Sequence, residues 1–207
     1  MHTALVFDTS IDFILEDERV LMRSLVQEDA AILVPFVLNE PNLWQYALTP
    51  ITNKAELTGY VDAAVQARTA GTAYPFIVFD KTLNKYVGST RFYDIQTNFK
   101  TTQLGYTWYS ESVWGTGLNE HCKFLLLQFA FEKIGFERVE FRADNRNKRS
   151  IAAMQKIGCT VEGILRNHLP TSDGTRRDSI VLSILKEEWP SVKEGFLARI
   201  KRLNQNK

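Results

Sequence analysis

Two glycines separated by one threonine stand where a strand-like segment gives way to a helix-like one. The segment Trp114-Gly115-Thr116-Gly117 follows β-rich residues, and the residues after it repeat apolar side chains at helical spacing. A helix that starts here leaves backbone N–H groups open at the positive end of its dipole, and glycine allows close approach. That chemistry suits a phosphate. The alternative is a tight turn in which Thr116 only caps the helix.

The spacing of these glycines excludes two common phosphate sites. It matches neither the GxGxxG of dinucleotide-binding folds nor the GxxxxGK[ST] of nucleoside triphosphatases. A nicotinamide dehydrogenase is therefore not expected. A second polar segment, Asn147-Lys148-Arg149-Ser150, opens another helix-like stretch, which Gly158 closes.

Together these segments resemble the GNAT superfamily of acetyltransferases. Residues 106–117 are similar to its cofactor-binding motif. Residues 144–159 are similar to the strand-to-helix segment of the branch that contains ribosomal-protein alanine and serine N-acetyltransferases, and so are residues 162–167 and 173–178. The resemblance spans about residues 19–189, with the motifs in the family's order.

The resemblance implies acetyl transfer from acetyl-coenzyme A to a primary amine, on a protein N-terminus or a small molecule. It implies a sheet whose fourth and fifth strands splay apart, with the pantetheine arm paired to the backbone of the fourth. Backbone amides from Gly115 to Glu120 would hold the pyrophosphate, Asn147 would bond the pantetheine arm, and Ser150 would lie near the thioester sulfur. The expected cofactor-binding residues are Trp108, Tyr109, Gly115, Thr116, Gly117, Leu118, Asn119, Glu120, Asn147 and Ser150.

Two positions depart from the family pattern. Asn119 stands where a small residue is usual. Met154 replaces a tyrosine that many relatives use as general acid, and methionine cannot donate a proton. We therefore predict that the Ser150 hydroxyl stabilises the departing thiolate. The alternative is a serine that only bonds the helix backbone. A non-catalytic acyl-coenzyme A-binding module is the alternative function.

The remaining chemistry needs a polarised carbonyl and a neutral amine. A backbone N–H of the fourth strand is expected to polarise the carbonyl. Glu140, Asp144 or a water relay could accept the proton. An α-amine with a pKa near 7.8 is neutral on the order of a tenth of the time at pH 7, far more often than lysine. A weak base would therefore suit an α-amine.

Other polar and aromatic residues support no further cofactor. His2, His121 and His168 are too far apart in the sequence to suggest a metal site, and His121 is interpreted as structural or solvated. Cys122 and Cys159 lack the spacing of a disulfide framework or a zinc site. Some aromatic residues line either the acceptor cleft or the core: Trp44, Tyr46, Phe92, Tyr93 and Tyr106.

Alternating and helical patterns give the order of the elements. This order predicts an α/β (α+β) fold with a mixed, mostly antiparallel sheet and helices on both faces. The expected strands are 19–25, 74–80, 86–93, 103–109, 138–142, 160–169 and 177–185, and the expected helices are 27–39, 54–68, 118–135, 147–157 and 187–203.

The bulk composition is that of an ordinary globular protein. The 207 residues are 44% hydrophobic and 24% charged, which favours a single acetyltransferase domain over 1–207 with its core at about 19–189. A net charge of +1 does not favour a nucleic-acid partner. No signal peptide or long apolar run is visible, which predicts a cytoplasmic protein without membrane contact. Monomer and homodimer both remain open.

Overall fold

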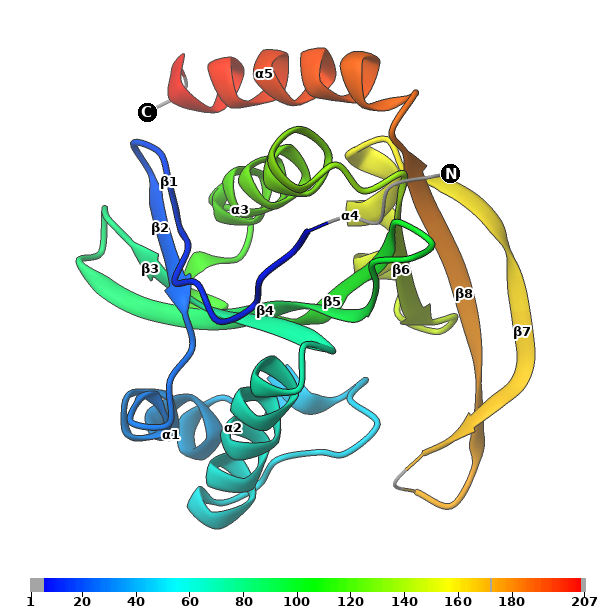
Figure 1. The fold of residues 1–207 in the computed structure, drawn as a ribbon. Helices are drawn as coiled ribbons and strands as arrows, with labels where there is room; N and C mark the ends of the chain where they lie inside the picture. The colour runs from blue at the N-terminus through cyan, green and yellow to red at the C-terminus, as the bar shows by residue number, and fades with distance from the viewer. Residues whose placement is uncertain (1–5, 172, 206–207) are drawn as a thin grey trace.

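A computed structural model describes residues 6–171 and 173–205 of the chain. Within this part, eight strands form one sheet in the order β1-β2-β3-β4-β5-β6-β8-β7 (Figure 1). The strands are β1 (Ile14–Glu16), β2 (Val20–Ser24), β3 (Ala73–Asp80), β4 (Lys85–Gln96), β5 (Thr101–Tyr109), β6 (Arg138–Asp144), β7 (Thr160–Pro170) and β8 (Arg176–Leu185).

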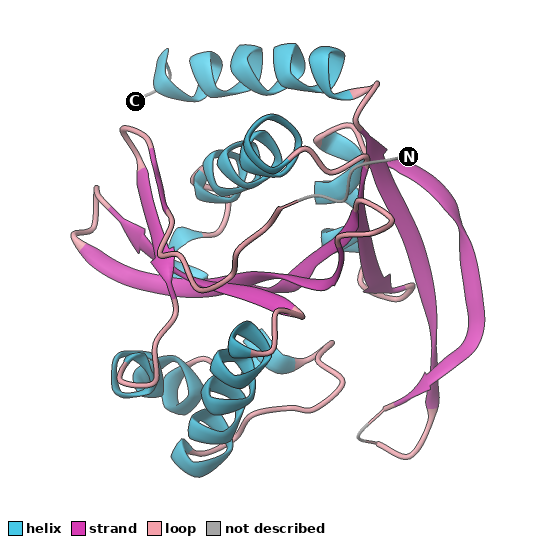
Figure 2. Cartoon of the chain, in the orientation of Figure 1, coloured by secondary structure: helices cyan, strands magenta, loops and turns pink. Residues whose placement is uncertain are grey.

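The helices cover both faces of this sheet, as the sequence predicts. In Figure 2 one pair lies below the sheet and the others lie above or behind it. The lower pair is α1 (Asp29–Asn39) and α2 (Lys54–Thr69); the others are α3 (Leu118–Gln128), α4 (Lys148–Lys156) and α5 (Trp189–Gln205), with short turns η1 (Pro41–Trp44) and η2 (Glu111–Val113) and the π-helix η3 (Phe129–Ile134). The expected mixed, mostly antiparallel fold is confirmed. Among the described residues, no helix is long and apolar enough to cross a bilayer.

Three details differ from the sequence prediction. The edge strand β1 was not expected, because its three residues are too few to show an alternating pattern. The connection expected at 94–102 shrinks to 97–100, since Gln96 pairs with Thr101. The helix that ends at Gly135 loses α-helical spacing after Gln128 and finishes as the π-turn η3.

The sheet opens between β5 and β6. These parallel strands pair only at Thr101 with Arg138, Thr102 with Val139 and Gln103 with Glu140. Beyond these pairs both strands continue without pairing to each other, and we call the gap between residues 104–109 and 141–144 the wedge. The fourth and fifth strands of the sequence prediction are β5 and β6, so the expected splay is present.

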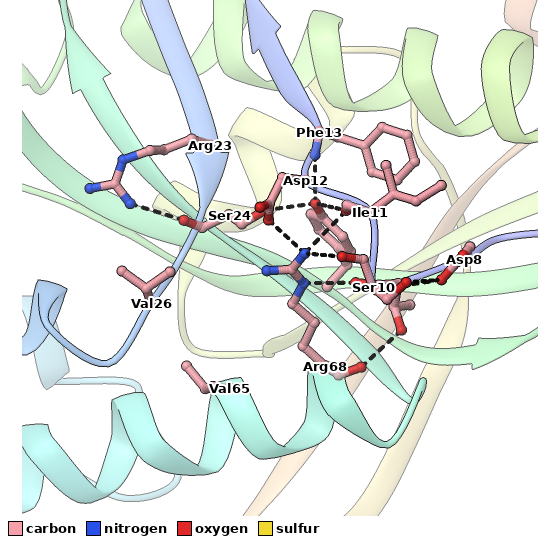
Figure 3. Close-up of polar contacts among 12 residues, drawn as sticks. Asp8, Ser10, Ile11, Asp12, Phe13, Arg23, Ser24, Val26, Val65 and Arg68 are labelled. Atoms are coloured by element: carbon pink, nitrogen blue, oxygen red, sulfur yellow. Dashed lines mark hydrogen bonds and ion pairs between the residues drawn. The ribbon is translucent and has the colours of Figure 1, made fainter.

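An arginine at the end of α2 holds the segment that precedes β1 against the sheet (Figure 3). Arg68 donates from Nε to the Thr9 carbonyl at 2.8 Å and from Nη2 to the carbonyls of Ser10 and Ile11. The same Nη2 contacts the Asp12 carboxylate at 2.7 Å. The Asp12 side chain is 79% exposed, so this ion pair is weak and the carbonyl contacts carry most of the stabilisation.

We expect Arg68→Ala to lower the free energy of unfolding by roughly 1–3 kcal/mol, because it leaves the Thr9 and Ser10 carbonyls without their donor and the Ile11 carbonyl with the Tyr74 hydroxyl alone. Chemical denaturation measures this loss. Hydrogen exchange should quicken at the N–H of Phe13, which donates to the Tyr74 hydroxyl beneath Arg68. Arg202→Ala, an exposed arginine of α5, is the matched control and should change stability by less than about 0.5 kcal/mol. Equal stability of the two variants would contradict this role.

Candidate active site

The glycine-rich loop leaves the first turn of α3 open. The Thr116 hydroxyl donates to the Val113 carbonyl at 2.8 Å and therefore does not cap the helix. The N-cap is Gly117, which has a left-handed φ of +88° and offers no side-chain acceptor. The alternative prediction, a tight turn in which Thr116 caps the helix, is therefore wrong. The N–H groups of Leu118, Asn119 and Glu120 lie in the first turn of α3, where the helix itself supplies no hydrogen-bond acceptor.

The two glycines of the loop have different surroundings. A Cβ on Gly115, whose φ is +73°, would meet nothing within 4 Å, so its backbone faces open space. A Cβ on Gly117 would lie 2.8 Å from Leu203 Cδ1, so α5 backs this glycine from behind. Open N–H donors at a helix start can bind an anion, and we call residues 115–120, with their open donors and the bare backbone at Gly115, the cradle.

The segment just before the cradle is anchored to α1. The Glu40 carboxylate accepts from the Ser110 hydroxyl at 2.8 Å and from the Glu111 N–H at 2.6 Å. The indole of Trp114 donates to the Tyr109 carbonyl at 2.8 Å. These contacts hold the cradle in place relative to β5.

The start of α4 lies beside the cradle. Asn147 caps α4, since its Oδ1 accepts from the Ser150 N–H at 3.0 Å, and its side-chain NH₂ remains available as a donor. The guanidinium carbon of Arg149 lies 3.7 Å from the centroid of the Trp114 ring, and Lys156 contacts Glu120 at 2.6 Å. The structure thus brings together the two segments that the sequence singled out.

Ser150 has a free hydroxyl. Its Oγ makes no hydrogen bond to any residue in the described ranges, so the alternative of a serine that only bonds the helix backbone is not seen. Met154 is 7% exposed and belongs to the main core. Ser150 is the residue of α4 that carries a hydroxyl group. The role of Ser150 in the reaction stays a prediction.

A β-bulge shapes the β5 side of the wedge. Ser89 pairs with Trp108 and Arg91 with Gly105, so Tyr106 and Thr107 together oppose Thr90. Tyr106 has a left-handed φ of +49°, which turns the local backbone out of the ladder. The bulge therefore interrupts the ladder with β4 at residues 106–107, in the part of β5 that borders the wedge.

Trp108 and Tyr109 contribute backbone rather than side chains to the wedge. The Trp108 ring is buried 5.2 Å from Trp44 in the core beneath α1 and α2. The Tyr109 ring is buried in the opposite core, where burial raises the pKa of its hydroxyl well above the usual value. Any contact of these two residues with a cofactor must therefore pass through their main chains.

The two carboxylates considered as bases are both held by arginines. Glu140 contacts Arg138 at 2.9 Å and Arg142 at 2.6 Å. Hydrogen bonds from Arg146 keep the pKa of Asp144 below its usual range. A carboxylate with a lowered pKa is a weaker proton acceptor, so the geometry makes Asp144 a poor base.

Sequence reasoning missed a buried lysine at the wedge. Lys123 of α3 is 6% exposed, and its Nζ donates to the Thr107 hydroxyl at 3.0 Å and lies 5.6 Å from the Phe141 ring centroid. Burial lowers the pKa of Lys123 to about 8. The signal was present, because Lys123 occupies the first position of an otherwise apolar i, i+3, i+4 pattern with Leu126 and Leu127.

The histidines and cysteines have structural surroundings. His121 is 2% exposed and lies 2.6 Å from Asp17, so it is buried rather than solvated. It also forms a cluster with Asp17 and Glu18, which the sequence spacing of the histidines could not reveal. Cys122 and Cys159 are free and buried. His2 lies outside the described residues.

The candidate acceptor aromatics divide between core and cleft. Trp44 and Phe92 are core residues, at 5% and 0% exposure. Tyr106 is 50% exposed, and its ring meets that of Tyr93 edge to face at 5.0 Å. Tyr46, on the loop after η1, lies near enough to Arg146 to contribute to the raised pKa of that arginine.

Comparison with known proteins agrees with this geometry. Residues 19–160, more than half of the chain, match the family described as "Acetyltransferase (GNAT) domain". The chain belongs to the GNAT acetyltransferase family. It is therefore an acetyl-coenzyme A-dependent N-acetyltransferase.

Individual relatives of this acetyltransferase support the same assignment. It is 24% identical to the "Uncharacterized N-acetyltransferase p20" of Bacillus licheniformis over 84% of the chain and 97% of the relative. A crystal structure of a GCN5-related N-acetyltransferase from Brucella melitensis has a TM-score of 0.83 and 25% identity, covering 90% of this chain and 84% of that one. RimL, a "Ribosomal L7/L12 alpha-N-protein acetyltransferase" in complex with coenzyme A, shares the fold with a TM-score of 0.74 and 20% identity over 84% of this chain and 98% of its own.

The residues present fit coenzyme A. The open N–H groups of the cradle suit a pyrophosphate, and a side chain at Gly115 would intrude on the open space that such a group needs. The wedge leaves β5 backbone without a sheet partner, as an extended amide-containing arm requires.

Proposed function

We propose that this acetyltransferase moves the acetyl group by direct attack of a primary amine on the thioester of acetyl-coenzyme A. The observation that carries the proposal is the alignment of two helix starts, the cradle and the start of α4, on either side of a wedge in the sheet. This arrangement offers an anion site, an unpaired strand edge and a free hydroxyl on the segments that border the wedge.

The cradle, β5 and the start of α4 each have a role in the proposal. The amides from Gly115 to Glu120 hold the pyrophosphate. The NH₂ of Asn147 binds the pantetheine arm, and a backbone N–H at the bulge of β5 stabilises the negative charge that develops on the thioester oxygen. The Ser150 hydroxyl donates a hydrogen bond to the departing thiolate. Acetyl-coenzyme A supplies the activated acyl group.

The acceptor in this proposal is an α-amine, of a protein N-terminus or a small molecule. Glu140 and Asp144 are both bound to arginines, which leaves a water relay to carry the proton. Such a weak relay suffices for an α-amine, because it is already neutral on the order of a tenth of the time at pH 7. The name of the structural neighbour RimL refers to the same type of acceptor.

Thiol release with acetyl-coenzyme A and a panel of amines tests the proposal. We expect release with peptides or amino acids that carry a free α-amine and much slower release with blocked N-termini. Release that requires a lysine side chain would contradict the α-amine assignment. Binding of acetyl-coenzyme A without release for any amine would favour a non-catalytic acyl-coenzyme A-binding module.

Replacing Ser150 by alanine tests its assigned role. We expect kcat to fall about tenfold while the KM for acetyl-coenzyme A changes less than about twofold, because the hydroxyl acts on the thiolate and not on the bound cofactor. Ser191→Ala, an exposed serine of α5, serves as the control. Full activity of Ser150→Ala would remove this residue from the mechanism.

The same proposal treats residues 1–207 as a single acetyltransferase domain. Its support is the packing of α5 against α3, through Trp189 and Phe196 on Phe124, beyond the end of the family match. A cytoplasmic location and the choice between monomer and homodimer remain predictions from the sequence.

A further inference from the structure

One buried arginine on the lower face of the sheet has no counterion. Two arginines among the described residues are less than 9% exposed, Arg19 at 6% and Arg91 at 8%. Arg19 donates to Asp80 at 2.7 Å and to Thr82 at 2.6 Å. Arg91 forms no side-chain hydrogen bond or ion pair with any residue of 6–171 and 173–205. At 8% exposure this guanidinium keeps only limited access to solvent and has no described counterion, which leaves its N–H groups able to bind an anion.

Two tyrosines fix the plane of this guanidinium. Its central carbon lies 3.8 Å from the centroid of the Tyr106 ring and 4.8 Å from that of Tyr60 in α2. Stacking uses the faces of the guanidinium and leaves the N–H groups on its edge unused. The edge is therefore pre-oriented to bind a planar anion through two parallel hydrogen bonds.

Arg91 stands next to the reacting position of the proposed function. It pairs across the ladder with Gly105, immediately before the bulge at Tyr106 and Thr107. Tyr60 belongs to α2, so the stack lies on the face of the sheet opposite α3 and α5 (Figure 1). Coenzyme A would enter from the side of α3 and α4, which leaves the Arg91 side for the acceptor.

Further donors without partners border the stack. The Tyr60 hydroxyl and the indole N–H groups of Trp44 and Trp108 are buried and have no hydrogen-bond partner among the described residues. They form a contiguous aromatic group, since the Trp44 ring lies 6.1 Å from that of Tyr60 and 5.2 Å from that of Trp108. Unpartnered donors therefore gather beside Arg91, although Gln103 Oε1 and Asp62 Oδ1 are also buried without a described partner on β5 and α2.

The carboxylates of this face do not neutralise Arg91. Glu140 is shared by Arg138 and Arg142, and Asp144 is taken by Arg146. Arg177 adds another positive charge near Tyr106 and Tyr93. The acceptor side of the wedge is therefore electropositive, which repels a simple polycation and favours a ligand with a negative group.

We propose that Arg91 binds a carboxylate carried by the amine acceptor. The acceptor class is then an amine with a carboxylate nearby, which is found in a free amino acid and in a peptide whose N-terminal residue is Asp or Glu. A single guanidinium in contact with two tyrosine rings suits one planar carboxylate, whereas a phosphate carries about two charges and is tetrahedral. This inference rests on the proposed function, whose amine acceptor it specifies.

Matched acceptors that differ only in the carboxylate test the inference. One arm compares amino acids with their α-carboxamides, corrected for the fraction of neutral amine. The other compares C-terminally amidated tripeptides that begin with Asp or Asn, and with Glu or Gln. We expect wild-type kcat/KM to favour the acid over its amide at least about tenfold in one arm, and that arm identifies the source of the carboxylate.

Variants at Arg91 connect this preference to the guanidinium. Arg91→Gln should reduce the acid-to-amide ratio to about one, and Arg91→Lys should leave an intermediate ratio because lysine lacks the planar fork. Arg202→Gln on α5, on the opposite face, should keep the wild-type ratio. Thermal unfolding of each variant separates loss of selectivity from loss of fold.

The outcomes distinguish the two proposals. Two outcomes would overturn the carboxylate site and leave the proposed function standing. One is thiol release with acid-to-amide ratios of kcat/KM near one in both arms. The other is an acid-to-amide ratio that stays at the wild-type value in Arg91→Gln. No release with any amine would overturn the proposed function. In that event, equilibrium binding of the same acid and amide pairs decides the inference: discrimination that disappears in Arg91→Gln supports it, and equal binding rejects it.

Discussion

Gly117→Val is expected to lower the affinity for coenzyme A by about two orders of magnitude or more and to destabilise the fold by roughly 1–3 kcal/mol. The φ of +88° at this position is strained for a β-branched residue, and the new Cβ would press on Leu203 of α5. Relaxing either strain moves the N–H groups at the start of α3, on which the pyrophosphate is proposed to rest. Calorimetric titration with coenzyme A and chemical denaturation measure the two effects.

Gly158 provides a matched control for this variant. It also has a left-handed φ, +99°, and a Cβ there would lie 3.0 Å from Val192 Cγ2, again in α5. Gly158→Val should therefore lose comparable stability but keep its affinity for coenzyme A, since its new side chain would press on Val192 and not on the open N–H groups at the start of α3. If both variants lose affinity equally, the loss reflects general destabilisation and the cradle assignment is wrong.

Lys123→Met is expected to raise the free energy of unfolding at pH 7 by roughly 2–3 kcal/mol, because it removes a buried charge that no described carboxylate balances. In the folded protein the pKa of Lys123 is lowered to about 8 from the usual 10.5. Between these two values the unfolded chain holds a proton that the folded chain has released. Lys123 therefore lowers the free energy of unfolding by its full amount below about pH 8, and this destabilisation decreases as the pH rises toward 10.5.

Denaturant unfolding at pH 7 and pH 10 measures this effect as the difference between variant and wild type. Cys122 and Cys159, whose pKa values burial raises to about 12, also affect stability in alkali, but both proteins contain them and their contribution cancels. Lys133→Met, an exposed lysine of η3, should change stability by less than about 0.5 kcal/mol. A less stable Lys123→Met protein, or a stability gain that is the same at both pH values, would contradict the assignment.

The parts of the site that depend on local sequence were predictable. The helix starts after Gly117 and at Asn147 were both expected from residue types and spacing, and the structure begins α3 at Leu118 and α4 at Lys148. The same reasoning could not decide between Thr116 as cap and Thr116 bonded to Val113, because both use the same hydroxyl within one turn.

The parts that depend on strand register were not predictable. Arg91 meets Tyr106 because a bulge places two residues of β5 opposite Thr90, and alternation alone gives no sign of that bulge. The pairing of Asp144 with Arg146 likewise depends on how the chain turns after β6. The sequence therefore indicated the two segments at the starts of α3 and α4, whereas the contacts of Arg91 and Asp144 became visible only in the structure.

The short contact between β5 and β6 also bears on what holds the sheet together. The strands from β1 to β5 pair in chain order, and β6, β7 and β8 pair among themselves, so the sheet has two halves. Three parallel pairs join the halves within the described strands. Few backbone hydrogen bonds therefore cross this seam, and the apolar core that α3 and η3 share with both halves must hold them together.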